Sequence, residues 1–189
     1  IPGVDLIIPD FTYLKEIQSR IRAIIITHAH DDQYGALPYL LNLVNAPVYA
    51  SQTTITYIKN KLEDKSRKIK SADFIPVLPS SDVVISGHKF HLFETTHSVA
   101  ESFGFALETP LGNIVYTSDY ISDYSARKGY TFDLPRIARI SEEFKTFLLR
   151  TESESADKPG NASPNHRITD KVKSVFEDAT GKIFVSLYT

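Results

Sequence analysis

The chain has 189 residues, of which 42% are hydrophobic and 23% charged, with a formal net charge of −2. This length allows one domain with a sizeable core and the start of another, and no segment is long and apolar enough to cross a bilayer. The charge gives no global attraction to nucleic acid, and the lack of cysteine excludes disulfides and thiolate metal sites. We expect a cytoplasmic protein without membrane contact, in which histidine and carboxylate would hold any metal. Because the sequence opens Ile-Pro-Gly with no methionine or leader, we also expect a fragment of a longer protein.

The first informative segment is an apolar run followed by a polar cluster. Residues 21–27 form a β-branched run that predicts a strand covered on both faces. Directly after it come His28, His30 and Asp32, which place two imidazoles and a carboxylate where the strand gives way to a turn. Transition-metal sites are commonly built in this way. The next residue, Gln33, carries a neutral amide and is a poor ligand for zinc.

Helical and strand patterns then alternate. Asp31 or Asp32 could cap a helix that carries leucines at helical spacing, and residues 48–50 form a second short strand. A longer helix is predicted over residues 53–70. Its second half is rich in lysine and arginine, which we interpret as a solvated face and not as an RNA contact, because acidic residues interrupt it.

The middle of the chain is a succession of strands separated by turns. The predicted strands cover residues 74–78, 83–85, 89–94, 103–108 and 114–117. Together with the earlier helices they predict a layered α/β domain. His88 and His91 flank residues 89–90 in this strand pattern and are interpreted as ordinary strand residues.

Two further candidate ligands stand where predicted strands end. His97 follows the strand at 89–94, and Asp119 follows the strand at 114–117. A single histidine or aspartate in such a place is more often structural. The three segments occur together, however, so we predict one metal site formed by His28, His30, His97 and Asp119.

The chain becomes polar and rich in serine, proline and glycine over residues 151–167, which is the best candidate for a domain boundary. Beyond it, apolar residues at helical spacing predict a helix ended by Gly181, and residues 183–187 predict a new strand. We therefore divide the chain into a first domain over residues 1–160 and the start of a second α/β domain over residues 161–189.

The order of these motifs resembles the metallo-β-lactamase superfamily, whose signature is HxHxDH, a later single histidine and a later single aspartate. Four segments narrow the resemblance to the β-CASP ribonuclease J family, namely residues 35–41, 97–99, 109–119 and 158–160. The resemblance implies an α/β fold, a partial metallo-β-lactamase αββα sandwich followed by the start of an inserted β-CASP domain. It also implies a zinc-dependent ribonuclease that hydrolyses RNA phosphodiester bonds.

The same resemblance implies roles for single residues. His28, His30 and His97 would bind a first zinc ion, Asp119 would bridge, and Asp32 with the residue at position 33 would bind a second ion. Asp32 would also orient or deprotonate the attacking water. Further candidates, for contact with RNA, are Ser98, Thr151 and Ser153.

The sequence departs from the family at informative positions. Gln33 replaces a histidine ligand, Glu152 and Glu154 bring negative charge to a segment that would face RNA, and Ser118 replaces a glycine. These changes predict the degenerate second paralogue, with one zinc ion, an impaired second site and weak cleavage. Such a protein would form homo-oligomers, or hetero-oligomers with an active sister ribonuclease.

Two alternatives follow from the same residues. One is a catalytically silent RNA-binding or scaffold subunit of a ribonuclease J complex. The other is a small-molecule hydrolase of the superfamily, against which the β-CASP-like segment after Arg167 argues.

Overall fold

The computed structural model describes residues 3–4, 7–62, 72–123, 129–154, 156–160 and 165–186, without the side chains of residues 62 and 165–168. In chain order, the helices and strands are α1 (Thr12–Glu16), η1 (Gln18–Arg20), β1 (Ile24–Ile26), α2 (Asp31–Tyr34), α3 (Leu37–Leu43), β2 (Val48–Ala50), α4 (Gln52–Leu62), β3 (Phe74–Pro76), β4 (Asp82–Ile85), β5 (His88–Glu94), β6 (Phe103–Leu107), β7 (Asn113–Tyr116), α5 (Leu134–Glu143), β8 (Thr146–Arg150) and α6 (Asn165–Asp178).

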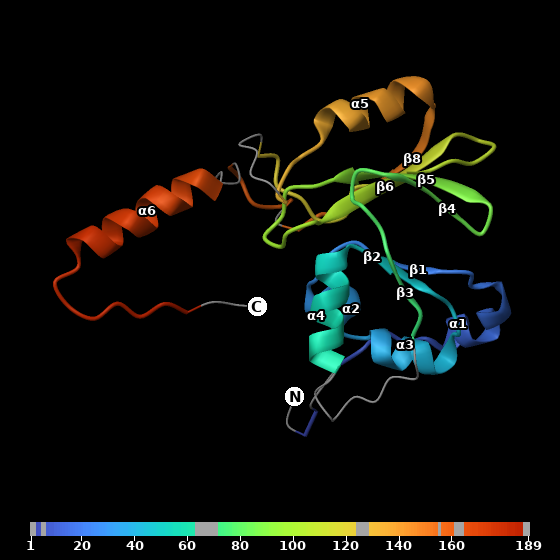
Figure 1. The fold of residues 1–189 in the computed structure, drawn as a ribbon, viewed down its shortest axis with the longest axis horizontal. Coiled ribbons are helices and arrows are strands. Elements are labelled where there is room, and N and C mark those ends of the chain that lie inside the picture. Colours follow the sequence, from blue (N-terminus) through green and yellow to red (C-terminus); the bar gives the residue numbers. More distant parts are fainter. Residues whose placement is uncertain are drawn as a thin grey trace.

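Two sheets lie between layers of helices (Figure 1). The smaller sheet has the order β1-β2-β3, with all strands parallel. The larger sheet has the order β4-β5-β6-β7-β8 and is antiparallel except for the parallel β7–β8 pair. Helices α2, α3 and α4 lie on the side of the smaller sheet and α5 on the outer side of the larger one. This arrangement is the predicted partial αββα sandwich.

Three apolar clusters hold these layers together. The first joins the smaller sheet to α2, α3 and α4, with Val48 and Ile58 fully buried. The second lies between the sheets around Leu92 and Phe103, and the third joins the larger sheet to α5 through Phe93 and Ile140. Burial of these side chains is the main stabilising contribution of the fold.

Most of the predicted elements are present with shifted ends. The strand predicted over residues 21–27 is shorter, and the helix predicted after Asp31 is split into α2 and α3. The helix predicted over residues 53–70 is α4 as far as Leu62, and its basic half from residue 63 onwards lies outside the described residues.

Helix α5 and strand β8 were not predicted. In α5, Asp133 caps the first turn by accepting a hydrogen bond from the backbone N–H of Arg136, and Pro135 occupies the first turn, as is common. All five residues of β8, residues 146–150, are exposed. This strand therefore has no buried face that would make apolar and polar residues alternate in its sequence.

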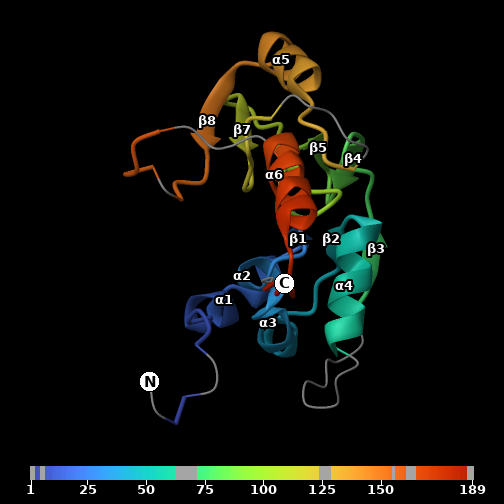
Figure 2. The ribbon, with the colours of Figure 1, turned by 90° about the vertical axis from the view of Figure 1, so that its left-hand side faces the viewer.

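The predicted strand over residues 183–187 is wrong for residues 183–186, which have no regular structure, while Leu187 lies outside the described residues. A strand needs a hydrogen-bonded partner, and the part of the chain that the structure describes offers none beside this segment. Helix α6 stands apart from both sheets, in front of them in Figure 2. Among the helices described, none has the length and apolar character needed to cross a membrane.

Candidate metal centre

Four predicted ligands meet at one edge of the sandwich. His28 and His30 follow β1, His97 follows β5, and Asp119 follows β7. Each offers one ligand atom, and these atoms all lie within 4.8 Å of one another. Three chain segments that are distant in sequence therefore converge on a space the size of one ion.

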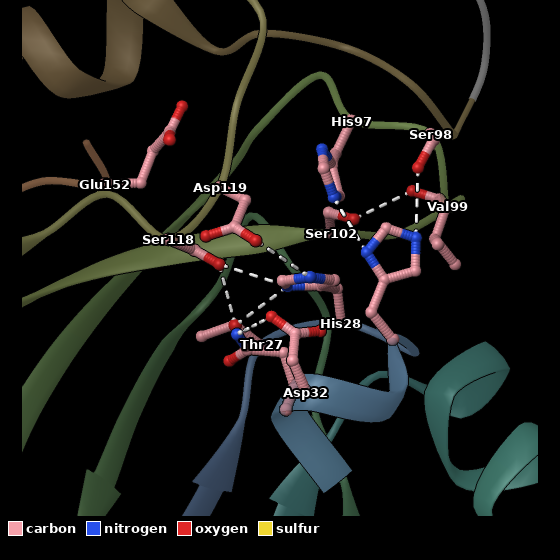
Figure 3. A network of polar contacts seen from close by, with 12 residues as sticks. Thr27, His28, Asp32, His97, Ser98, Val99, Ser102, Ser118, Asp119 and Glu152 are labelled. Carbon is pink, nitrogen blue, oxygen red and sulfur yellow. Dashed lines mark hydrogen bonds and ion pairs between the residues drawn. The ribbon is translucent and has the colours of Figure 1, made fainter. Parts of the chain in front are cut away.

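The three imidazole rings surround this space edge to face. Their centroids are 4.7–4.9 Å apart, with interplanar angles of 73–82°. His97 Nε2 lies 3.0 Å from His30 Nδ1, and His28 Nε2 lies 3.4 Å from Asp119 Oδ2. Figure 3 shows His28 beside Asp119. Three nitrogens and one carboxylate in this arrangement are a donor set suited to zinc.

The strongest indication that a metal ion fits this site is the buried imidazole of His28. Its side chain is fully buried, and within the described structure its Nε2 atom has no hydrogen-bond partner. An unpaired polar atom in a protein interior is costly and requires an explanation. A cation bound between His28 and Asp119 would satisfy both groups.

The surroundings of His28 and His97 favour the neutral imidazole, which is the form that binds a cation. Burial, followed by repulsion from His97 and His30, lowers the pKa of His28 to about 4. Burial and repulsion from His30 also lower the pKa of His97. Both rings are therefore neutral at pH 7 and present lone pairs.

The pKa of the carboxylate in this site, Asp119, is shifted upward. Burial, followed by the neighbouring carboxylates of Asp32 and Glu152, raises the pKa of Asp119. Negative charges gathered without a cation disfavour one another, and a bound metal ion would relieve this repulsion.

A triangle of hydrogen bonds orients His28. Its Nδ1 lies 3.1 Å from Thr27 Oγ1 and 3.2 Å from Ser118 Oγ, and Ser118 donates to Thr27 over 2.7 Å. All three side chains are buried, and Figure 3 shows them in contact with one another. Such partners fix the orientation and tautomer of a ligating histidine, here leaving Nε2 for the metal. Ser118 adopts φ of 59°, the left-handed conformation that glycine tolerates best.

Asp32 and Gln33 lie beside the four-residue cluster, on α2. Asp32 is exposed, and the side-chain amide of Gln33 donates to its Oδ2 over 3.2 Å. The amide nitrogen of Gln33 is thus occupied by Asp32, and its carbonyl oxygen is the remaining, neutral donor at that position.

The other predicted site residues differ in whether they contact the four clustered residues. Ser98 Oγ lies 3.0 Å from His30 Nε2, so it contacts a candidate ligand directly. Thr151 accepts a hydrogen bond from Thr117 over 3.2 Å at the end of β8, and Ser153 is exposed in the following segment.

Sequence reasoning missed Thr27 as a site residue. Its place immediately before the first histidine, at the end of a buried strand, was the available signal. Ser118 was identified only as a departure from a family pattern, because its contact with His28 depends on how β1 and β7 converge.

Comparison with known proteins gives one family match and several relatives. Residues 2–159 match the profile of the metallo-beta-lactamase superfamily. The chain is 36% identical over 184 residues to Ribonuclease J 2 of Streptococcus pyogenes and 35% identical over 187 residues to Ribonuclease J 2 of Staphylococcus aureus. These alignments cover 97–98% of this chain but 33% of each relative, so the chain spans about a third of their length.

Solved structures share the fold at low sequence identity. A B3 metallo-beta-lactamase with an active-site glutamic acid superimposes with a TM-score of 0.51 and 15% identity, covering 89% of this chain and 76% of that one. A protein of unknown function from Enterococcus faecalis gives a TM-score of 0.55 at 14% identity, covering 82% and 39%.

Proposed function

The chain belongs to the metallo-β-lactamase superfamily, and we propose on that basis that it is the metal-binding part of a zinc-dependent ribonuclease of the ribonuclease J type. The observation that carries the proposal is the convergence of His28, His30, His97 and Asp119, with the buried Nε2 of His28 facing Asp119 and forming no hydrogen bond within the described residues. The Ribonuclease J 2 relatives support RNA as the substrate.

The four clustered residues would hold one zinc ion. When bound, zinc supplies Lewis-acid stabilisation of negative charge on a phosphoryl group and makes a water molecule more acidic. Asp32, exposed beside the cluster, would orient this water or accept its proton. Thr27 and Ser118 would keep His28 in the ligating orientation.

Gln33 would leave a second metal position weak. An amide oxygen is a poorer zinc donor than imidazole, and the Gln33 side chain is already directed to Asp32. Glu152 and Glu154 add negative charge beside Asp119 and would repel a phosphate backbone. We therefore propose that cleavage is weak, while Ser98, Thr151 and Ser153 supply polar contacts to RNA.

The proposal extends to organisation and partners. Residues 1–160 would be the first segment of the metallo-β-lactamase domain, and residues 161–189 the linker and opening of a β-CASP domain. The family match ends at residue 159, and the described side chains of α6 are exposed, which supports this division. The protein would act on RNA in the cytoplasm as a homo-oligomer, or as a hetero-oligomer with an active sister ribonuclease.

A second candidate function is an RNA-binding or scaffold subunit without cleavage of its own. The Gln33–Asp32 hydrogen bond favours it, because this contact occupies the residue that would complete a second metal position.

The test is elemental analysis of the protein at its full natural length, together with RNA cleavage, before and after Gln33→His. We expect one zinc per chain, rising to two in the variant with a large gain in cleavage. The matched control is Gln52→His, which adds a histidine at an exposed position of α4 and should bind no extra zinc. Two zinc ions without a gain in cleavage would favour the scaffold, and no zinc in any form would refute the metal proposal.

A further inference from the structure

A pocket of about 550 Å³ opens next to the candidate metal centre. It shares two wall residues with that centre, His30 and Ser98, whose side chains contact each other over 3.0 Å. The rest of its wall comes from α2, from α4 and from the segments around Val99 and Tyr130. A molecule bound to the metal centre would therefore border on this pocket. Its volume lies within the usual range for small-molecule sites, roughly 300–1,000 Å³.

The wall of the pocket combines aromatic rings with uncharged polar groups, and the lysine among its described residues forms an ion pair. Three tyrosines line it: Tyr34, Tyr57 and Tyr130. Tyr34 is 3% exposed and forms part of the core, whereas Tyr57 on α4 is 52% exposed. Thr53 and Asn60 on the same helix add uncharged hydrogen-bonding groups. Aromatic faces with neighbouring amide and hydroxyl groups suit a flat heterocycle, which stacks and forms hydrogen bonds at its edges.

The charge in the pocket argues against a phosphate site. Lys61 is the one lysine or arginine among the described residues that line it, and its ammonium group already pairs with Asp31. The same ammonium lies 5.6 Å from the centre of the Tyr34 ring. Burial, followed by the hydrogen bond to Asp31, raises the pKa of Tyr34, so its hydroxyl stays neutral. A neutral ligand group fits this wall better than an anion.

Several contacts hold α4 in place, so the pocket is preformed. The backbone N–H of Thr53 donates to Glu101 over 3.0 Å, which ties the start of the helix to the loop after His97. The N–H of Thr54 donates to Ser51 over 3.2 Å as an N-terminal cap. Lys61 and Asp31 join the other end of α4 to α2. A ligand would need to order little of this wall on binding.

We propose that this pocket binds a nucleobase of single-stranded RNA, that of the nucleotide next to the phosphate held at the metal centre, with Tyr57 as the stacking surface. The proposal rests on the proposed ribonuclease function, because RNA at the metal centre supplies the neighbouring base. It adds a base-binding subsite that would set which nucleotide lies beside the cleaved bond.

The experiment is a binding titration by fluorescence anisotropy, with the protein at its full natural length, zinc present and a nuclease-resistant phosphorothioate RNA. Tyr57→Leu is compared with Tyr13→Leu, a control on α1 that removes a tyrosine of somewhat greater exposure, 65%, away from the pocket. Tyr57→Leu and the unaltered protein are also titrated with a series of abasic RNAs that lack one base at a time.

We expect Tyr57→Leu to weaken binding about tenfold, while Tyr13→Leu leaves it unchanged. One abasic RNA should bind the unaltered protein about tenfold more weakly and show no further loss with Tyr57→Leu, since both changes remove the same contact. An unaltered protein that does not bind RNA would overturn the proposed function. The subsite proposal alone would be overturned by either of two results. In the first, the protein binds RNA and Tyr57→Leu does not weaken this binding. In the second, Tyr57→Leu weakens binding by the same factor for every abasic RNA.

Discussion

Two buried histidines in this chain have opposite surroundings. His28 is fully buried at the candidate metal centre, where its Nε2 has no hydrogen bond in the described structure and its neighbours are two further imidazoles and Asp119, whose Oδ2 lies 3.4 Å away. His91 in β5 is 5% exposed, and each of its nitrogens faces a carboxylate: Asp82 at 3.0 Å and Glu108 at 2.7 Å. The same residue type thus lies in one site whose donor atoms suit a cation and in another where carboxylates, a lysine and an arginine from the protein surround it.

The surroundings of His91 show what a structural role looks like. Lys89 and Arg136 add positive charge to the same group, with Arg136 bonding Asp82 from α5. His91 lowers the pKa of Glu108 through its hydrogen bond, and against the effect of burial it also lowers that of Asp82. The cluster joins β4, β5, the end of β6 and α5, and needs no ion from outside. This contrast favours His28 over His91 as a metal ligand in the proposed site.

The largest expected effect comes from removing the ligand. His28→Asn should abolish zinc binding, measured by elemental analysis. It should also remove the rise in melting temperature that zinc produces, since ligand at a thousandfold excess over its Kd stabilises a protein by about 4 kcal/mol. A variant that keeps its zinc would contradict the assignment of His28.

Removal of His91 should change the stability of the fold and not the binding of zinc. His91→Leu should lower the free energy of unfolding by roughly 1–3 kcal/mol, because carboxylates lose a buried partner. Zinc content should not change. The control is His88→Leu at an exposed position of the same strand, for which we expect a change within about 0.5 kcal/mol. Denaturant titration measures both, and equal effects would show that the His91 cluster contributes nothing particular.

Ser118 allows the orientation of His28 to be separated from the stability of the fold. Ser118→Ala removes the hydroxyl but keeps the left-handed backbone, so we expect a loss of about 1–2 kcal/mol. Ser118→Gly should recover about 1 kcal/mol of this loss. Both variants should bind zinc roughly 10–100-fold more weakly. Unchanged zinc affinity in a competition titration with a chelator would show that the hydroxyl does not position His28.

The smallest effect concerns pH and Glu108. Its pKa in the fold lies below the ordinary value of 4.5, chiefly because of His91, so the ionised carboxylate stabilises the folded state. This stabilisation is present above pH 4.5 and is lost as the pH falls through the lowered value. Glu108→Gln should therefore cost below about 1 kcal/mol near pH 7, since the group is partly exposed, and progressively less in acid. Exposed Glu142→Gln serves as the control, and a cost that does not depend on pH would contradict the mechanism.

The strands that carry the ligands could be predicted from the amino-acid sequence alone. Residues 21–27 and 89–94 carry apolar side chains that require burial, and a polar residue just after such a segment lies at a strand end, so the pattern of residues was enough to predict where His28, His97 and Asp119 lie. The fold class was predictable for the same reason. Helix α5 was missed although Asp133 and Pro135 signal its start, and strand β8 could not be predicted because it has no buried face that would produce an alternating pattern.

How side chains from distant segments meet was settled by the packing of the layers. The contact of Ser118 with His28 joins residues 90 positions apart, and the role of His91 depends on Asp82 and Glu108 from neighbouring strands. The position of Tyr57 in the pocket next to the candidate metal centre also follows from helix placement. Local propensity contains no information about such pairs, since their energies arise from packing, distance and burial after the layers have assembled.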